Sequence, residues 1–421
     1  MGLKSKLKKL LGQKNRQRIR GLKAQLRYRK TRKNAGRLTM RSRDWAEPVV
    51  YSLPGKHVFF GYYDIQQVKG RRMLVTVVPQ KADTRRDPAQ LQWIDMETGD
   101  YHDIATTRAW CWQQGSRLRW HPTLEDTVLY NDVEGDRYVC RIRDLETGTT
   151  RTLGAALYDI TPDGRFGLSL DYSRLQRLRP GYGYDVLPDR TQGEAVPKND
   201  GIFLVDLDSG ERKLVVSYEQ LVELDPESAG GLNYVNHISV SPDGERFLFF
   251  HLWTPEVGAR WHGTLCTARL DGSGLERVEK SFVPSHYCWR GSDTLLITSV
   301  GFGGSPSYYY LYDLTRGTRE KLRSEHLDKD GHPSFMADGQ RFLSDTYPQG
   351  GSMQQLYIAD VAGERYEPIC DIYSDPRLFD DKRCDLHPRL APDGVTITID
   401  CTCWEGKRSV LLLSKTGKEK S

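Results

Sequence analysis

Short hydrophobic stretches recur along most of the chain, each followed by a turn that contains glycine and usually Asp. They occupy residues 93–99, 142–148, 204–210, 268–274, 310–317, 358–363 and 412–417. A second turn signal, such as Pro162–Gly164 or Pro392–Gly394, precedes each copy, so every unit holds two hairpins. Seven four-stranded units of about 45–62 residues, without alternating helices, predict an all-β protein, a seven-bladed β-propeller.

The last unit lacks an outer strand, because only four residues follow Gly417. The apolar segment Pro48–Leu53 has no other obvious partner, so we expect it to complete the seventh blade and close the ring. Helical patterns are scarce in this part of the chain, and Tyr218–Leu224 is the best short candidate. We therefore assign residues 47–421 to the propeller and residues 1–46 to an N-terminal extension.

The extension differs from the propeller in charge. Residues 1–43 contain 17 Lys and Arg and no acidic residue, whereas the rest of the chain has 44 basic and 56 acidic residues. Its apolar residues follow a helical spacing, which predicts a basic amphipathic helix: Leu3, Leu7, Leu10, Leu11, Ile19, Leu22 and Leu26. Such a helix suits an anionic membrane surface or an acidic glycan. A solubilising tail is the alternative, and we expect no specific nucleic-acid partner.

Basic residues recur too often in the extension to leave the apolar centre of a signal peptide. The chain also has no run of 18 apolar residues that would span a bilayer. The eight cysteines form no CxxC pair, which predicts reduced thiols. We expect a cytoplasmic protein, with peripheral contact to a membrane left open.

Four histidines occupy equivalent positions in consecutive units. His237, His332 and His387 each lie six residues before a turn Asp, and His286 lies seven residues before Asp293. These positions begin innermost strands, so their side chains should converge on one half of the channel. One such histidine alone is usually a hydrogen-bonded rim residue. Four together suit a divalent metal ion, zinc or manganese above all, or a general base.

The third unit carries arginine and tyrosine instead. Tyr158 begins its inner strand, Arg174 is placed at the end of the next strand, and a loop with Tyr182 and Tyr184 follows. A guanidinium binds a carboxylate through two hydrogen bonds, and aromatic faces accept sugar rings, so this pattern suits an acidic poly- or oligosaccharide. Other arginines of the loop fit a solvated surface equally well. Arg174 is the stronger candidate, because an inner strand has little other reason to hold an arginine.

Several motifs together resemble the seven-bladed polysaccharide lyases. They are GYYD (61–64), NHIS (236–239), FFHLW (249–253), GHP (331–333), SDTYP (344–348), RCDLHPR (383–389) and EGKR (405–408). The likeness is greatest to the ulvan lyases and more distant to the oligogalacturonate lyases, and it covers about residues 47–415. It implies cleavage of a uronic-acid glycan by β-elimination, with a divalent metal ion in the propeller.

The resemblance also implies roles for individual residues. Arg174 would neutralise the uronate carboxylate, Tyr158 would exchange a proton with C5 or the leaving O4, and His237 matches the catalytic histidine. The residues assigned to the metal are His286, His332 and His387. Those assigned to substrate binding are Gln114, Tyr182 and Tyr184.

Two functions stay open on this evidence. The first is a metal-containing lyase, and the second is a non-catalytic propeller that binds acidic glycan or a protein partner and whose histidines are structural. A peptidase propeller is not expected, because the sequence has no GxSxG motif. A WD-repeat scaffold is disfavoured, because no unit shows the WD signature.

Overall fold

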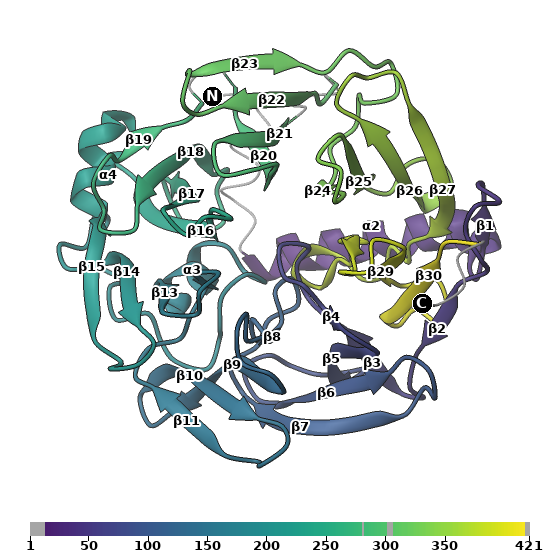
Figure 1. Ribbon diagram of the computed structural model, residues 1–421, viewed down its shortest axis with the longest axis horizontal. Helices are drawn as coiled ribbons and strands as arrows, with labels where there is room; N and C mark the ends of the chain where they lie inside the picture. Colours follow the sequence, from purple (N-terminus) through teal and green to yellow (C-terminus); the bar gives the residue numbers. More distant parts are fainter. Residues whose placement is uncertain (1–12, 280–281, 301–305, 417–421) are drawn as a thin grey trace.

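A computed structural model describes residues 13–279, 282–300 and 306–416 of the chain. Seven antiparallel sheets surround a central channel (Figure 1), which confirms the predicted all-β propeller. The short helix α4 spans Tyr218–Leu224, the predicted residues, because Ser217 and Gln220 form a capping box at its start.

In each of the first four blades the strands follow one another from the channel outward. Blades one and two contain β3 (Lys56–Phe59), β5 (Arg72–Pro79), β6 (Ala89–Asp95) and β7 (Tyr101–Thr107), then β8 (Arg119–Trp120), β9 (Thr127–Glu134), β10 (Arg137–Asp144) and β11 (Thr150–Leu153). Blades three and four contain β12 (Asp159–Ile160), β13 (Phe166–Ser169), β14 (Gly201–Asp206) and β15 (Arg212–Ser217), then β16 (Leu232–Val240), β17 (Arg246–Thr254), β18 (His262–Arg269) and β19 (Glu276–Arg277).

The other three blades follow the same order. Blade five contains β20 (Pro284–Trp289), β21 (Thr294–Ser299), β22 (Tyr309–Asp313) and β23 (Thr318–Lys321). Blade six contains β24 (Ser334–Phe335), β25 (Arg341–Asp345), β26 (Met353–Asp360), β27 (Tyr366–Tyr373) and, as a fifth strand, β1 (Leu38–Met40). Blade seven contains β28 (Arg389–Leu390), β29 (Thr396–Cys401), β30 (Ser409–Ser414) and β2 (Val49–Tyr51).

Helices, 3₁₀ turns and one extra strand make up the rest of the secondary structure in the described residues. They are α2 (Gln13–Thr31), α3 (Tyr172–Leu178), the 3₁₀ turns η1 (Arg32–Asn34), η2 (Pro226–Ser228), η3 (Gly350–Ser352) and η4 (Asp380–Lys382), and β4 (Val68–Lys69), which pairs with β5. All eight cysteines are unpaired, as predicted. Among the described residues, no helix combines the length and the apolar character needed to cross a bilayer.

The ring closes as predicted, because β2 pairs with β30 as the outer strand of the seventh blade. The N-terminal extension is attached to the propeller as well. β1 pairs with β27, and Trp45 is buried in the core shared by blades six and seven. The predicted basic helix is α2, which includes Ile19, Leu22 and Leu26. Leu3, Leu7, Leu10 and Leu11 lie outside the described residues.

The connections of each blade alternate between the two faces of the ring, because successive strands are antiparallel. In blade six, the segment between β25 and β26 and the segment from β27 to β28 therefore lie on one face, and the other two hairpins lie on the opposite face. His332 and His387 directly precede β24 and β28. They consequently lie on the first face, which we call the histidine face.

Candidate metal centre and adjoining cavity

The four histidines predicted from their register converge on one side of the channel. The ring centres of His286 and His332 lie 4.2 Å apart, and those of His332 and His387 lie 4.5 Å apart. Tyr62 packs among them, with its ring centre 4.6 Å from that of His237 and 4.7 Å from that of His387. The prediction of a histidine cluster from blades four to seven is confirmed.

Tyr62 reaches the histidines because the inner strand of the first blade is interrupted. β3 and β4 both pair with β5, and residues 61–64 between them enter the channel. The Asp400 carboxylate accepts the N–H groups of Phe60 and Gly61 and holds this segment in place. Gly61 has a φ of 147°, and a Cβ there would lie 3.0 Å from the backbone of Gln114. Only glycine allows this close approach of two chain segments.

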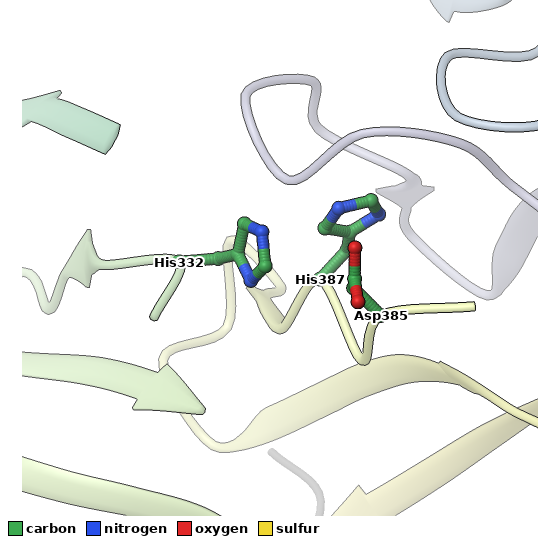
Figure 2. Close-up of side chains that lie close together, drawn as sticks. All are labelled: His332, Asp385 and His387. Carbon is green, nitrogen blue, oxygen red and sulfur yellow. The ribbon is translucent and has the colours of Figure 1, made fainter. Parts of the chain in front are cut away.

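Three side chains of this cluster form a candidate metal site. The ligand atoms of His332, Asp385 and His387 all lie within 4.8 Å of one another, and all three residues are buried. Figure 2 shows the carboxylate of Asp385 beside the ring of His387, with His332 facing them. The Nε2 atom of His387 is buried and has no hydrogen-bond partner among the described residues. Two imidazole nitrogens and one carboxylate oxygen suit zinc or manganese, so these residues fit the predicted divalent ion.

The histidines are oriented by their Nδ1 atoms. Nδ1 of His332 lies 2.8 Å from the Asp345 carboxylate, and Nδ1 of His387 lies 2.7 Å from the carbonyl oxygen of Gly61. Nδ1 of His286 likewise lies 3.0 Å from Oδ1 of Asp330. An acceptor at Nδ1 places the proton there and leaves Nε2 as the coordinating atom, which is the usual arrangement around metal-binding histidines.

The electrostatics of the cluster favour the ionisation states that bind a cation. Burial lowers the pKa of His387 well below its ordinary value, and the neighbouring His332 lowers it further. Burial alone would raise the pKa of Asp385, but the guanidinium of Arg383 outweighs it and keeps that pKa below its ordinary range. His332 differs from His387: burial opposes its charge, yet the Asp345 carboxylate raises its pKa. A neutral His387 and an ionised Asp385 are ready for a metal ion, and the carboxylate of Asp345 makes His332 the harder of the two histidines to deprotonate.

His237 stands apart from the three ligand candidates and has a strained backbone. Its φ is 52°, in the left-handed region that residues with a side chain seldom adopt. The Tyr158 hydroxyl accepts its N–H at 3.0 Å, and the Tyr287 hydroxyl donates to its carbonyl oxygen. Burial lowers the pKa of His237 well below its ordinary value, with Arg179 adding to the effect. The imidazole is therefore neutral near pH 7, and its buried Nδ1 has no partner among the described residues.

A cavity of about 200 Å³ adjoins the cluster. The polar side chains that line it come from six segments: Arg179, Tyr182, His237, Ser285, His286, Asp330, Tyr347 and Arg383. Tyr347 lies between β25 and β26 and Arg383 precedes β28, so the cavity is on the histidine face.

Two arginines bring positive charge to this cavity in different ways. The guanidinium of Arg179 lies 4.8 Å from the ring centres of both Tyr182 and Trp261, and its Nε is buried without a partner among the described residues. Arg383 is held by Asp385, whose carboxylate accepts from its Nε at 2.9 Å. Arg179 is thus the better placed of the two to receive an anionic group from the cavity.

Tyr158, predicted to exchange a proton with substrate, is fully buried below the cavity. Its hydroxyl accepts from Nε2 of Gln114 at 2.7 Å and donates to Oδ1 of Asn236 at 3.1 Å, besides accepting from the backbone of His237. Gln114, predicted to bind substrate, belongs to this buried network and does not line the cavity. Tyr158 therefore supports the backbone of His237, and Gln114 holds the Tyr158 hydroxyl.

The placement of Arg174 on a strand was wrong. It lies on α3, because Asp171 caps the helix by accepting the N–H groups of Ser173 and Arg174. The guanidinium is fully buried and donates to four backbone carbonyls, those of residues 191, 194, 195 and 233. With a fifth bond, from Nη1 to the hydroxyl of Thr191, they tie a long loop to β16 and leave no N–H of the guanidinium free for a substrate carboxylate.

The two tyrosines predicted to bind substrate have different environments. Tyr182 lines the cavity, with its ring centre 5.4 Å from that of His237. Tyr184 is buried in the core, where it stacks on Tyr172 at 4.2 Å and its hydroxyl accepts from Asn131. Only Tyr182 is therefore placed to touch a ligand.

Sequence reasoning missed Asp385 and Asp345, and it left Arg179 open between a ligand-binding residue and a solvated surface arginine. Asp385 lies two residues before His387, and this alternate spacing along an extended segment was a usable signal for a second ligand. Asp345 ends β25 and meets His332 only because that strand pairs with β24. No local pattern reveals such a contact.

Comparisons with known proteins agree with this architecture. No protein-family model matches the sequence, and a comparison with curated proteins finds no relative. Among solved structures, an oligogalacturonate lyase in complex with manganese aligns with a TM-score of 0.63 at 16% identity, over 90% of this chain and 96% of that one. An oligogalacturonate lyase from Vibrio parahaemolyticus aligns with a TM-score of 0.63 at 13% identity, with the same coverage. These likenesses establish the fold and leave the chemistry to be argued from the site.

Proposed function

We propose that this protein is a divalent-metal-dependent lyase that cleaves uronate-containing oligosaccharides by β-elimination. The observation that carries the proposal is the group formed by His332, Asp385 and His387 beside a cavity that also presents His237 and Arg179. The fold it shares with a manganese-containing oligogalacturonate lyase supports the reaction class. The motifs similar to ulvan lyases support a uronate of a structural polysaccharide as the substrate.

The metal ion would be held by Nε2 of His332, Nε2 of His387 and the Asp385 carboxylate, with His286 adjacent. When bound, the ion supplies positive charge that makes the proton at C5 of a uronate more acidic. The site itself favours a cation: Asp345 and Asp385 are 0% and 2% exposed, and Arg383 neutralises only one of these two carboxylates.

Arg179 is the residue we assign to the uronate carboxylate, in place of Arg174. Its guanidinium is stacked between two aromatic rings and so keeps a fixed orientation, and its unpartnered Nε can donate to an anion in the cavity. Charge builds up on the carboxylate when C5 loses its proton, so this contact strengthens in the transition state.

His237 is the base that we expect to remove the C5 proton. Its imidazole is neutral near pH 7, lines the same cavity as Arg179 and has an unpartnered ring nitrogen. The proton that the leaving O4 requires comes from a phenol, and Tyr182 and Tyr347 both line this cavity. Base, acid and carboxylate partner thus surround one space.

The reaction is tested by incubating the purified protein with a panel of uronic-acid oligosaccharides and metal ions. β-Elimination creates a C4=C5 double bond conjugated with the carboxylate, which is followed by its ultraviolet absorbance. We expect product with at least one substrate, and a fall in kcat of about 100-fold or more in Arg179→Ala, with partial recovery in Arg179→Lys.

The metal site is tested separately by elemental analysis. Asp385→Asn and His387→Ala should lose bound metal, and metal addition should raise the Tm of the unaltered protein but not that of these two variants. His102→Ala is the matched control, because His102 stacks on Trp93 at the outside of the first blade. Metal binding without product formation from any substrate would instead support the non-catalytic glycan-binding propeller.

A further inference from the structure

Helix α2 packs on the propeller along one side only. A Cβ at Gly21 would lie 3.6 Å from the ring of Phe379, Ala24 is buried, and the ring centre of Tyr28 lies 3.9 Å from the guanidinium of Arg377. Thr31 ends the series with a 3.3 Å hydrogen bond between its hydroxyl and that of Tyr373. The spacing of three and four residues places all four contacts on a single helical face.

The largest apolar side chains of α2 point the other way. Ile19, Leu22 and Leu26 are 39%, 66% and 56% exposed, and they are also spaced by three and four residues. Leu22 and Leu26 each lie two positions from Ala24, about 200° around the helix axis from the packed face. A surface helix normally buries its apolar side against the protein. α2 instead turns that side to the outside.

Basic residues border this outward apolar face. Arg18 and Arg29 flank it on one side, Lys23 and Lys30 flank it on the other, and all four are exposed. No acidic residue occurs anywhere in residues 1–43. An apolar stripe between two basic rows is complementary to a bilayer that offers acyl chains beneath anionic headgroups.

The position of α2 relates this face to the cavity. Arg27 donates to the carbonyl oxygen of Pro348, and Arg20 pairs with Asp380. These partners lie in the segments that also supply Tyr347 and Arg383 to the cavity, so α2 rests on the histidine face. Figure 1 shows α2 extending from near the middle of the ring toward its rim, in the region of blades six and seven.

We propose that the outward face of α2 docks on an anionic lipid bilayer and turns the histidine face, with its cavity, toward the membrane. The helix lies parallel to the bilayer, inserts Ile19, Leu22 and Leu26, and places its basic rows among the headgroups. This inference is independent of the reaction proposed above, because it rests on α2 alone.

The test uses the full chain and two kinds of vesicle, phosphatidylcholine alone and phosphatidylcholine mixed with phosphatidylglycerol, in a sedimentation assay. The unaltered protein should bind the mixed vesicles and lose binding as salt rises. The double variant Leu22→Gln, Leu26→Gln should bind at least about 10-fold more weakly, because two inserted side chains are lost. Glutamine is a good helix former, and an unchanged Tm verifies folding.

Leu124→Gln is the matched control, because Leu124 is also 50% exposed but lies between β8 and β9 on the opposite face. It should bind as the unaltered protein does. A pair of dye-labelled variants reports orientation: Gln349→Cys is on the histidine face and Gln340→Cys is on the opposite face of the same blade. Only the dye at position 349 should shift to shorter wavelength with mixed vesicles.

Three results would overturn the proposal. One is equal binding to both kinds of vesicle, or to neither. Another is undiminished binding by the double leucine variant. The third is a protein that binds a soluble acidic polysaccharide but no vesicles, and whose polysaccharide binding is unchanged in the double leucine variant. That result would assign the basic rows to a glycan.

Discussion

The two halves of the channel wall are both rich in polar residues, but they use them differently. On the side of the third blade, the Arg174 guanidinium and the Tyr158 hydroxyl form their hydrogen bonds with other groups of the protein. On the side of blades four to seven, buried ring nitrogens of His237 and His387 have no partner among the described residues. A buried polar atom is normally paired, so these imidazole nitrogens are available to a ligand.

The difference shows that residue type alone does not identify a site. An arginine in the channel wall and an arginine in the cavity look alike in sequence, yet Arg174 holds a loop and Arg179 faces open space. Replacing residues on the two sides of the channel should therefore change different measured quantities. On the side of the third blade it should lower the free energy of unfolding, and on the side of the histidines it should lower kcat.

The largest effect is expected for Arg174→Met. The substitution removes five hydrogen bonds that a fully buried guanidinium donates, so the free energy of unfolding should fall by about 3–5 kcal/mol, a large fraction of the stability of many domains. Urea denaturation measures it. The control is Arg190→Met, whose side chain is 71% exposed and pairs with an exposed Asp136; it should cost less than about 0.5 kcal/mol. A stable Arg174→Met protein that only lacks activity would return Arg174 to the active site.

His237→Gln should produce the opposite pattern. Loss of the base should lower kcat by about 10²- to 10⁴-fold, measured by product absorbance, while the urea midpoint stays near that of the unaltered protein. Glutamine can keep a polar group beside Tyr62, which limits the structural change. Full turnover in this variant would remove His237 from the reaction.

The repeated features of the chain were accessible from sequence because they are local. Each hairpin is encoded by its own turn residues, and the closing strand was found because the apolar segment Pro48–Leu53 had no other obvious partner. The histidines were found because their register repeats. Arg174 was misplaced although Asp171, Leu175 and Leu178 form a helix start and an apolar side that were recognisable. Contacts such as that of Asp345 with His332 join separate strands, so they required the tertiary structure.

Asp200 adds a test within the third blade, because one of its oxygens is buried without a partner among the described residues. Burial, and then the charge of Asp171, raise its pKa to about 7. This value exceeds that of the unfolded chain, about 3.9, so ionisation destabilises the fold and the unfolding free energy falls as pH rises from about 4 to 7. Asp200→Asn should therefore gain about 2–4 kcal/mol at pH 8 and little at pH 4.

The control for this pH dependence is Asp206→Asn in the same blade. Backbone N–H groups of residues 208 and 209 donate to the Asp206 carboxylate, and the bond from Ser209 is the leading reason that its pKa is lowered. Its charge therefore stabilises the fold above the unfolded pKa, and the substitution should destabilise the protein at pH 8. The same sign for both variants would contradict the assigned environments.

Tyr158→Phe is expected to change stability and turnover the least. It tests whether Tyr158 supports His237 or itself takes part in the reaction. The hydroxyl makes three internal hydrogen bonds, one of which holds the strained backbone of His237. Its loss should lower the free energy of unfolding by about 1–3 kcal/mol. Because the His237 side chain remains, kcat should fall by no more than about tenfold with KM unchanged, far less than in His237→Gln. A loss of turnover as deep as that of His237→Gln, with stability intact, would show that Tyr158 itself exchanges the proton.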